Sequence, residues 1–154
     1  MAKPKKQSAG ILLYRIVAEK TEFFLVHPGG PYWKNKHNES WTIPKGEFEA
    51  EDPLKAAIRE FKEETGTTLK GPFLPLTPVL QKSGKLIHAW AAAGDIDPAK
   101  MTSNTFDMEW PPRSGQKMSF PEVDKGGWFD LPNATRLINP AQTVLLEELT
   151  RLIA

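Results

Sequence analysis

The chain has 154 residues, of which 40% are hydrophobic and 25% are charged, so it is long enough for one globular domain with a substantial core. Its formal net charge of +1 argues against a chain built to bind nucleic acid or an anionic membrane through a global basic field. The absence of cysteine excludes disulfides, thiolate catalysis and cysteine metal sites. No apolar run reaches the roughly 18 residues of a transmembrane helix. We therefore expect a cytoplasmic protein without membrane association, in which residues 1–7 form a disordered basic tail.

Two buried strands are predicted at the start of the chain. Residues 8–17 (SAGILLYRIV) and 21–28 (TEFFLVHP) are rich in aliphatic and aromatic residues, and the short turn AEK lies between them. A loop rich in glycine, proline and asparagine runs to residue 40, and WTIP, residues 41–44, predicts a short strand.

The strongest helix signal covers residues 52–65. Asp52 is a favourable N-cap, Pro53 suits the first helical position, and Gly66 is a natural C-terminal stop. Three apolar residues share the face that would pack on a sheet: Leu54, Ile58 and Phe61.

The second half of the chain predicts mainly strands and one more helix. Residues 75–81 and 85–96 surround a turn, KSGK, and predict a hairpin. Residues 105–110 predict a strand, 111–119 a polar loop and 126–131 a short strand or turn. Asn139 and Pro140 are expected to cap a final amphipathic helix. The apolar residues expected on its buried face are Val144, Leu145, Leu149 and Leu152. This order of elements predicts a mixed sheet covered by helices.

The predicted helix over 52–65 carries a stripe of three acids, Glu60, Glu63 and Glu64. Residues three and four apart are neighbours on a helix, so Glu60 meets another acid, Glu64, and only Glu63 has a cation at that spacing, Arg59. Each like-charge pair costs about 0.2–0.5 kcal/mol in an isolated helix. A solvated charged face is the ordinary explanation, whereas a hard divalent cation, which takes oxygen ligands, would explain why the acids gather.

The residues around this stripe resemble the signature of the Nudix (MutT-like) hydrolase superfamily. In words, that pattern is a glycine, five residues, Glu, seven residues, Arg-Glu, an aliphatic or similar residue, any residue, Glu-Glu, any residue, a glycine and an aliphatic residue. The matching positions are Glu51, Arg59, Glu60, Phe61, Glu63, Glu64 and Gly66. Two positions depart from it: four residues rather than five separate Gly46 from Glu51, and Thr67 stands where an aliphatic residue is usual.

The resemblance implies an α/β (α+β) fold class, the Nudix α/β/α sandwich with a mixed sheet between helices, formed by a single domain over residues 8–154. It implies that Glu60, Glu63 and Glu64, with the Gly46 carbonyl, hold magnesium, with manganese as the alternative ion. Glu60 or Glu64 would also orient water, and Arg59 would fix Glu63 or a neighbouring carboxylate. The reaction implied is hydrolysis of a nucleoside diphosphate linked to a further group.

Several residues outside the signature are candidates for the same site. Glu109, at the end of a predicted strand, is either a further metal ligand or a surface acid. Three cations, Lys45, Arg113 and Lys117, either meet substrate phosphates or are solvated loop residues. Tyr32 and Trp33 either stack on a base or form a surface apolar cap.

Three other functions fit the sequence less well than this hydrolase. An isoprenyl diphosphate isomerase of the same fold would rely on a cysteine, which this chain lacks. A non-catalytic nucleotide-binding or regulatory module would typically have lost the glutamates that are present here. A nucleic-acid-binding domain is not indicated, because the sequence has no basic stripe; a capped RNA end is the one nucleic-acid substrate left.

The segments HPGGPYW, IPKGE and EWPPRSG are similar to a bacterial subgroup of predicted NTP pyrophosphohydrolases and to diadenosine tetraphosphate hydrolases. Nucleoside triphosphates, dinucleoside polyphosphates and nucleotide sugars stay open as substrates, and a monomer or a homodimer as the assembly.

Overall fold

In the computed structural model, which describes residues 6–154, the sheet is built around β1 (Gln7–Val17). One edge of β1 pairs in parallel with β5 (Leu86–Ala93). The other edge is shared by two antiparallel partners, β3 (Lys45–Phe48) near its start and β2 (Lys20–Pro28) near its end. The β1 and β2 strands therefore diverge, and the chain around residues 42–48 fills the fork between them.

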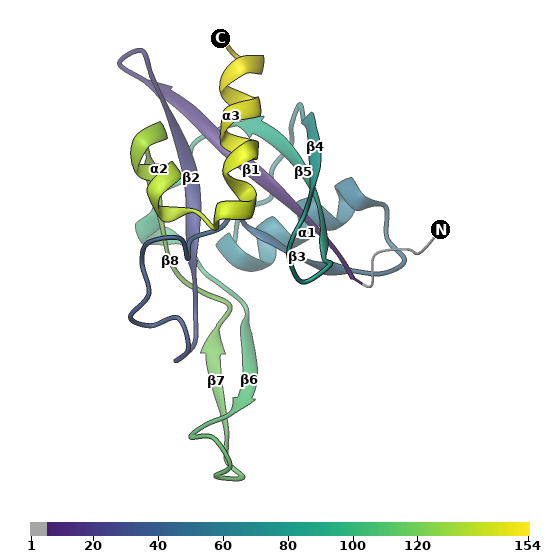
Figure 1. The fold of residues 1–154 in the computed structure, drawn as a ribbon, viewed down its shortest axis with the longest axis vertical. Helices are drawn as coiled ribbons and strands as arrows, with labels where there is room; N and C mark the ends of the chain where they lie inside the picture. Colours follow the sequence, from purple (N-terminus) through teal and green to yellow (C-terminus); the bar gives the residue numbers. More distant parts are fainter. Residues whose placement is uncertain (1–5) are drawn as a thin grey trace.

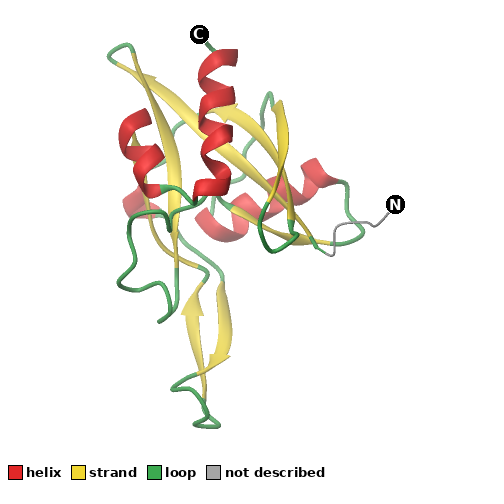
Figure 2. Ribbon diagram, in the orientation of Figure 1, coloured by secondary structure: helices red, strands yellow, loops and turns green. Residues whose placement is uncertain are grey.

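The rest of the sheet extends this arrangement to both sides. β4 (Leu74–Leu80) and β8 (Val123–Phe129) are the outer strands, and the strand order is β4-β5-β1-β2-β8. The helix α1 (Pro53–Thr65) covers one face, and α2 (Leu131–Leu137) and α3 (Thr143–Leu152) cover the other (Figures 1 and 2). Two short 3₁₀ helices, Pro98–Lys100 and Pro140–Gln142, lie in the connections. The expected α/β/α sandwich with a mixed sheet is confirmed.

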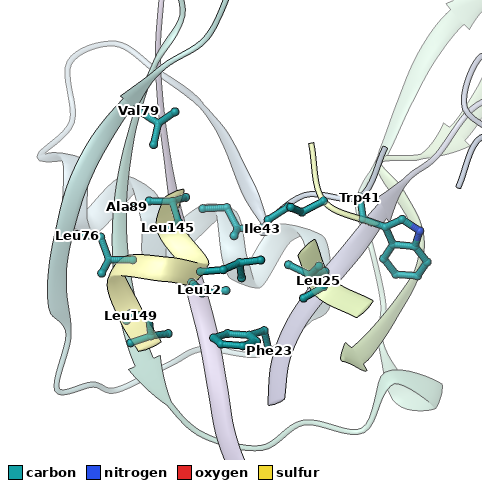
Figure 3. Close-up of a cluster of buried hydrophobic side chains, with 14 of the residues drawn as sticks. Leu12, Phe23, Leu25, Trp41, Ile43, Leu76, Val79, Ala89, Leu145 and Leu149 are labelled. Atoms are coloured by element: carbon teal, nitrogen blue, oxygen red, sulfur yellow. The ribbon is translucent and has the colours of Figure 1, made fainter. Parts of the chain in front are cut away.

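Each face of the sheet has its own apolar core. Because side chains alternate along a strand, β1 sends Leu12 to one face and Ile11 and Leu13 to the other. On the α3 side, Leu12 packs with side chains from β2, β4 and α3, among them Phe23, Leu76 and Leu145 (Figure 3). On the α1 side the strand residues meet a second set, which comprises Phe24, Val26, Ala56, Ala57 and Phe61.

The ends of α1 are set by the local signals in its sequence. The Asp52 carboxylate accepts a hydrogen bond from the Lys55 N–H at 3.1 Å. Gly66 adopts a left-handed conformation, with φ of 86°, and its N–H donates to the Lys62 carbonyl. The predicted boundaries of this helix are confirmed to within one residue.

A two-stranded hairpin projects from the body of the molecule (Figure 1). It consists of β6 (Thr105–Glu109) and β7 (Lys117–Pro121), and we call residues 105–121 the arm. The prediction of a loop over 111–119 is wrong from residue 117 onward, because Lys117 and Met118 pair with β6 across the turn. This strand is formed by its partner rather than by a pattern of its own.

Three further predictions differ from the structure. Residues 41–44 form two isolated bridges, and the regular strand begins only at Lys45. The helix α2 was not predicted, although Asp130 caps it by accepting a hydrogen bond from the Asn133 N–H. On α3, Val144 and Leu152 are about half exposed, and Leu146 is buried instead.

The first strand begins one residue earlier than predicted. β1 begins at Gln7, the last residue of the predicted tail, and residues 1–5 of that tail lie outside the described residues. No helix within residues 6–154 is long and apolar enough to cross a membrane.

Candidate active site

Two acids of α1 point toward β3 rather than toward solvent. Glu60 and Glu64 are each only 7% exposed. The Lys45 N–H donates to Glu64 Oε1 at 3.2 Å. A β carbon placed on Gly46 would lie 1.9 Å from Glu60 Oε1, so only glycine leaves room for that carboxylate. The close approach of β3 and α1 therefore fixes both acids.

Arg59 binds three carboxylates at once. Its Nε donates to both oxygens of Glu51 at 3.0 Å, and its Nη1 donates to Glu60 Oε2 and Glu63 Oε2 at 2.7 Å each. The pair with Glu63 is the one expected from their spacing along the helix. Hydrogen bonding to Glu51 raises the pKa of the Arg59 guanidinium, which stays charged. The guanidinium thereby joins the segment before α1 to the middle of the helix.

Glu122 completes a group that the sequence did not reveal. It lies between β7 and β8, where its N–H donates to the Asn104 carbonyl and its own carbonyl accepts from the Gly29 N–H. Carboxylate oxygens of Glu60, Glu64 and Glu122 lie within 4.8 Å of one another, and we call these residues the carboxylate cluster. The only local signal was an acid at the start of an apolar strand, which is too common to identify a ligand.

Each of the three acids of the carboxylate cluster has a raised pKa. Burial, reinforced by the Glu63 charge, raises the pKa of Glu60 to about 7. Burial also raises the pKa of Glu64 well above its ordinary value, against the attraction of the Lys45 ammonium. Burial likewise raises the pKa of Glu122, with a further contribution from the Glu63 charge. Without a cation, the protein favours protons on these oxygens.

The chemistry of this donor set fits a divalent metal ion. Carboxylate oxygens are the ligands of hard cations such as magnesium, which usually binds through one or two carboxylates together with substrate phosphates and water. A bound cation would also favour the ionised form of these acids, against the burial and the neighbouring negative charges that raise their pKa values. The cluster can therefore hold a divalent metal.

The structure does not bring Glu109, Arg113 or Lys117 to the carboxylate cluster. They lie at the far end of the arm, where Lys117 is opposite Glu109 in the strand register (Figure 1). The Glu109 carboxylate accepts the N–H groups of Arg113 and Gly115 at 3.1 and 3.0 Å. Glu109 thus caps its own turn. Glu122, not Glu109, is the acid from this part of the chain that joins the carboxylate cluster.

Lys45, in contrast, lies beside the cluster. Its backbone binds Glu64, and its ammonium interacts with the charges of Glu64, Glu47 and Glu60. Burial, followed by the nearby Lys85 charge, lowers the pKa of the Lys45 ammonium. A cation in this position can meet the phosphate oxygens of a substrate at the cluster.

Tyr32 and Trp33 lie on the loop that leaves β2, residues 29–40. Their rings form an edge-to-face pair with centroids 4.8 Å apart, and the Tyr32 side is largely exposed. The Lys36 ammonium lies 3.5 Å from the centre of the Tyr32 ring. The loop begins at Gly29, whose N–H donates to the Glu122 carbonyl, so the aromatic pair is connected through the backbone to the carboxylate cluster.

Two hollows adjoin the segment that runs beside the cluster. One, of about 440 Å³, is lined by Lys62, Glu63, Gly66 and residues 102–104. The other, of about 510 Å³, lies between residues 98–103 and the start of β8. Both volumes fall in the range of small-ligand sites. Glu63 lines the first hollow, and none of the three cluster acids lines either one.

The sequence of this chain is similar to those of known proteins. The family model of the NUDIX domain matches residues 5–147. The bis(5'-nucleosyl)-tetraphosphatase (asymmetrical) of Caenorhabditis elegans is 43% identical over 63 residues, which cover 40% of this chain and 41% of that protein. The chain thus matches less than half the length of this curated relative. The family match confirms the resemblance to the Nudix superfamily.

Solved structures show the same fold. A C. elegans Ap4A hydrolase binary complex superposes with a TM-score of 0.66 and 25% identity, covering 96% of this chain and 97% of that one. The NUDIX domain of Shewanella oneidensis NrtR, solved with ADP ribose, gives a TM-score of 0.69 at 13% identity, over 99% and 91% of the two chains. The second likeness concerns the fold alone.

Proposed function

The chain belongs to the Nudix family, and from this premise we propose that it hydrolyses a pyrophosphate bond in a nucleoside diphosphate joined to a further group. The observation that carries the proposal is the carboxylate cluster, in which acids from α1 and from the β7–β8 junction converge on one point. Three partly or fully buried acids with raised pKa values cost the protein stability, and such groups are typical of functional sites. Binding a catalytic cation is a function that would explain them.

The residues proposed to hold the cation are Glu60, Glu64 and Glu122, with the Gly46 carbonyl beside them. Magnesium is the proposed ion and manganese the alternative, because both take oxygen ligands. When bound, such an ion neutralises phosphate oxygens and lowers the pKa of water for in-line attack.

The chain's own residues prepare this reaction. Arg59 fixes Glu60 and Glu63 in one orientation, and Lys45 adds a positive charge next to Glu64. Glu60 or Glu64 would also orient the attacking water, since both carboxylates are held at the cluster. Glu109 is not needed for this arrangement, since its carboxylate is occupied by the turn of the arm.

Dinucleoside polyphosphates and nucleoside triphosphates are the proposed substrate classes. The resemblance to an Ap4A hydrolase over nearly the whole chain favours the first class. Tyr32 and Trp33 offer stacking surfaces for a base. The stacking proposal rests on the exposure of the Tyr32 ring and on the hydrogen bond between Gly29, at the start of this loop, and Glu122. Arg113 and Lys117 are not assigned to the substrate, because they lie at the far end of the arm.

The test is a release assay for phosphate and pyrophosphate over dinucleoside polyphosphates, nucleoside triphosphates, ADP-ribose and nucleotide sugars, with magnesium, with manganese and with EDTA. Glu60→Gln should lower the rate at least about a hundredfold, because it removes one of the converging oxygens. Glu147→Gln, an exposed acid on α3, is the matched control and should leave the rate unchanged. A folded protein that hydrolyses no substrate, or whose activity survives Glu60→Gln, would contradict the proposal and favour a nucleotide-binding module.

A further inference from the structure

His27 is a buried residue that the proposed reaction does not use. It lies near the end of β2, is fully buried, and is bonded through both nitrogens of its ring. Nδ1 is 2.8 Å from Asp124 Oδ1, and Nε2 is 2.5 Å from the backbone carbonyl oxygen of Lys36. The ring therefore connects β8 to the loop of residues 29–40.

The bond from His27 to the loop has a fixed direction. A backbone carbonyl only accepts hydrogen bonds, so Nε2 of His27 donates its N–H to the Lys36 carbonyl. The Ser40 hydroxyl donates to the same carbonyl at 3.0 Å. The backbone of Lys36 is therefore held both by the buried ring and from within its own loop.

A β-bulge brings Asp124 to this position. His27 pairs with Lys125 and Pro28 pairs with Val123, so Asp124 is an extra residue without a partner of its own in β2. Bulges redirect side chains, and here the redirected carboxylate meets the histidine ring.

The remaining surroundings of His27 contain one further imidazole ring and one cation. The His37 ring, from the 29–40 loop, stacks on His27 with centroids 5.7 Å apart, and Trp41 contacts His27 edge-on at 5.5 Å. Lys125 faces His27 in the register of β8, and its ammonium lies 5.8 Å from the centre of the Trp41 ring. Asp124 is the carboxylate bonded to Nδ1 of the ring.

We propose that His27 is the positioning residue of the 29–40 loop, and that it holds the loop through the N–H of its Nε2. The bond to the Lys36 carbonyl fixes the backbone of a residue whose ammonium lies against the Tyr32 ring. The orientation of the aromatic pair thus depends on a buried ring that touches no substrate. The effect on substrate binding rests on the proposed function; the bonding pattern does not.

Limited trypsin digestion tests the connection directly. Trypsin cleaves after lysine, and the carbonyl that His27 holds belongs to the Lys36–His37 peptide bond. We expect His27→Gln to speed cleavage at this bond at least about tenfold, because a buried hydrogen bond is lost. His88→Gln is the matched control, since His88 is a sheet histidine bonded only to the Gln7 side chain. Equal cleavage rates in wild-type protein and His27→Gln would overturn the proposal.

The direction of the bond is tested by nitrogen-15 NMR of the histidine rings in the wild-type protein, under conditions where the loop resists trypsin. We expect Nε2 of His27 to show the shift of a protonated nitrogen, because its partner is a backbone carbonyl. A wild-type Nε2 without a proton would overturn this assignment, whether or not His27→Gln folds.

Kinetics then connect the loop to the substrate. His27→Gln should raise the KM for the best nucleotide about tenfold and change kcat less than twofold, while His88→Gln changes neither. If the wild-type protein hydrolyses no nucleotide, the proposed function fails, but the trypsin and NMR results still decide the role of His27. If His27→Gln lowers kcat alone, the ring does not act through the substrate loop.

Discussion

Arg59 divides the acids near it into two kinds. Glu51, Glu60 and Glu63 are bonded to the guanidinium, whose single positive charge offsets one of their three negative charges. Glu64 is buried, accepts a backbone N–H from Lys45 and is attracted by the Lys45 ammonium. These four acids carry more charge than the two cations offset, and a bound metal ion would supply part of the difference.

Replacing Glu64 by Gln should separate activity from stability. We expect the hydrolysis rate to fall at least about a hundredfold, because a proposed metal ligand is lost. In EDTA, the free energy of unfolding should stay unchanged or rise by about 1 kcal/mol, because a repelled, buried acid has been removed. Urea unfolding and kcat/KM measured on the same samples check this. A large loss of stability would instead make Glu64 a structural residue.

At the level of secondary structure, β3 and α1 form the site through one close contact. Gly46 belongs to a strand that fills the fork of the sheet, and its missing side chain leaves space for the Glu60 carboxylate. The geometry of the cluster thus depends on how closely this strand approaches the helix.

Gly46→Ala should test that contact. The added methyl group would meet a carboxylate at 1.9 Å, and this end of the side chain can move aside. We therefore expect a cost of only about 1 kcal/mol in unfolding free energy, but a loss of magnesium affinity and activity of at least about tenfold. Gly94→Ala, whose new methyl group would meet only a Leu13 methyl group, is the control and should retain activity. Unchanged magnesium affinity in Gly46→Ala would remove Glu60 from the site.

The elements that sequence reasoning recovered are those that carry their own signals. The helix α1 has its cap, its proline and its terminal glycine within a few residues of one another, and the Arg59–Glu63 pair follows from helical spacing. β7 and Glu122 lack such signals, since the first is paired by β6 and the second is placed by backbone bonds to Asn104 and Gly29. Contacts between distant segments determined both, and no local pattern encodes them.

For the molecule as a whole, the metal site and the apolar cores are separate. The cores lie on the two faces of the sheet and are made of aliphatic and aromatic side chains. The acids of the carboxylate cluster add repulsion rather than cohesion when no cation is bound. The fold should therefore persist in EDTA, and its stability should respond to pH and to metal.

We expect the metal-free protein to lose stability as pH rises from about 4.5 to about 7. The folded pKa of Glu60 lies above its ordinary value, so the folded state keeps a proton that the unfolded chain releases, and roughly 1–3 kcal/mol is lost across this window. Below it both states are protonated and nothing is lost. Magnesium at about a hundred times its Kd should restore about 2.7 kcal/mol, or roughly 5–10 °C in Tm. This gain should grow with pH, because the cation competes with protons.

Thermal and urea unfolding over this pH range, in EDTA and in magnesium, measure the effect. Glu64→Gln should flatten both the pH dependence and the response to magnesium. A metal-free protein that gains stability over the window, or that unfolds outright in EDTA, would contradict the separation of site and core.

The arm has a consequence for how this chain can change its length. The Glu122 N–H donates to the Asn104 carbonyl at 2.8 Å, so the chain leaves and rejoins the body at one point. Residues 105–121 can therefore be shortened, or replaced by a reporter domain or an affinity tag, at little entropic cost to the sheet. Such a graft would stand next to Glu122, within the sequence but outside the cores.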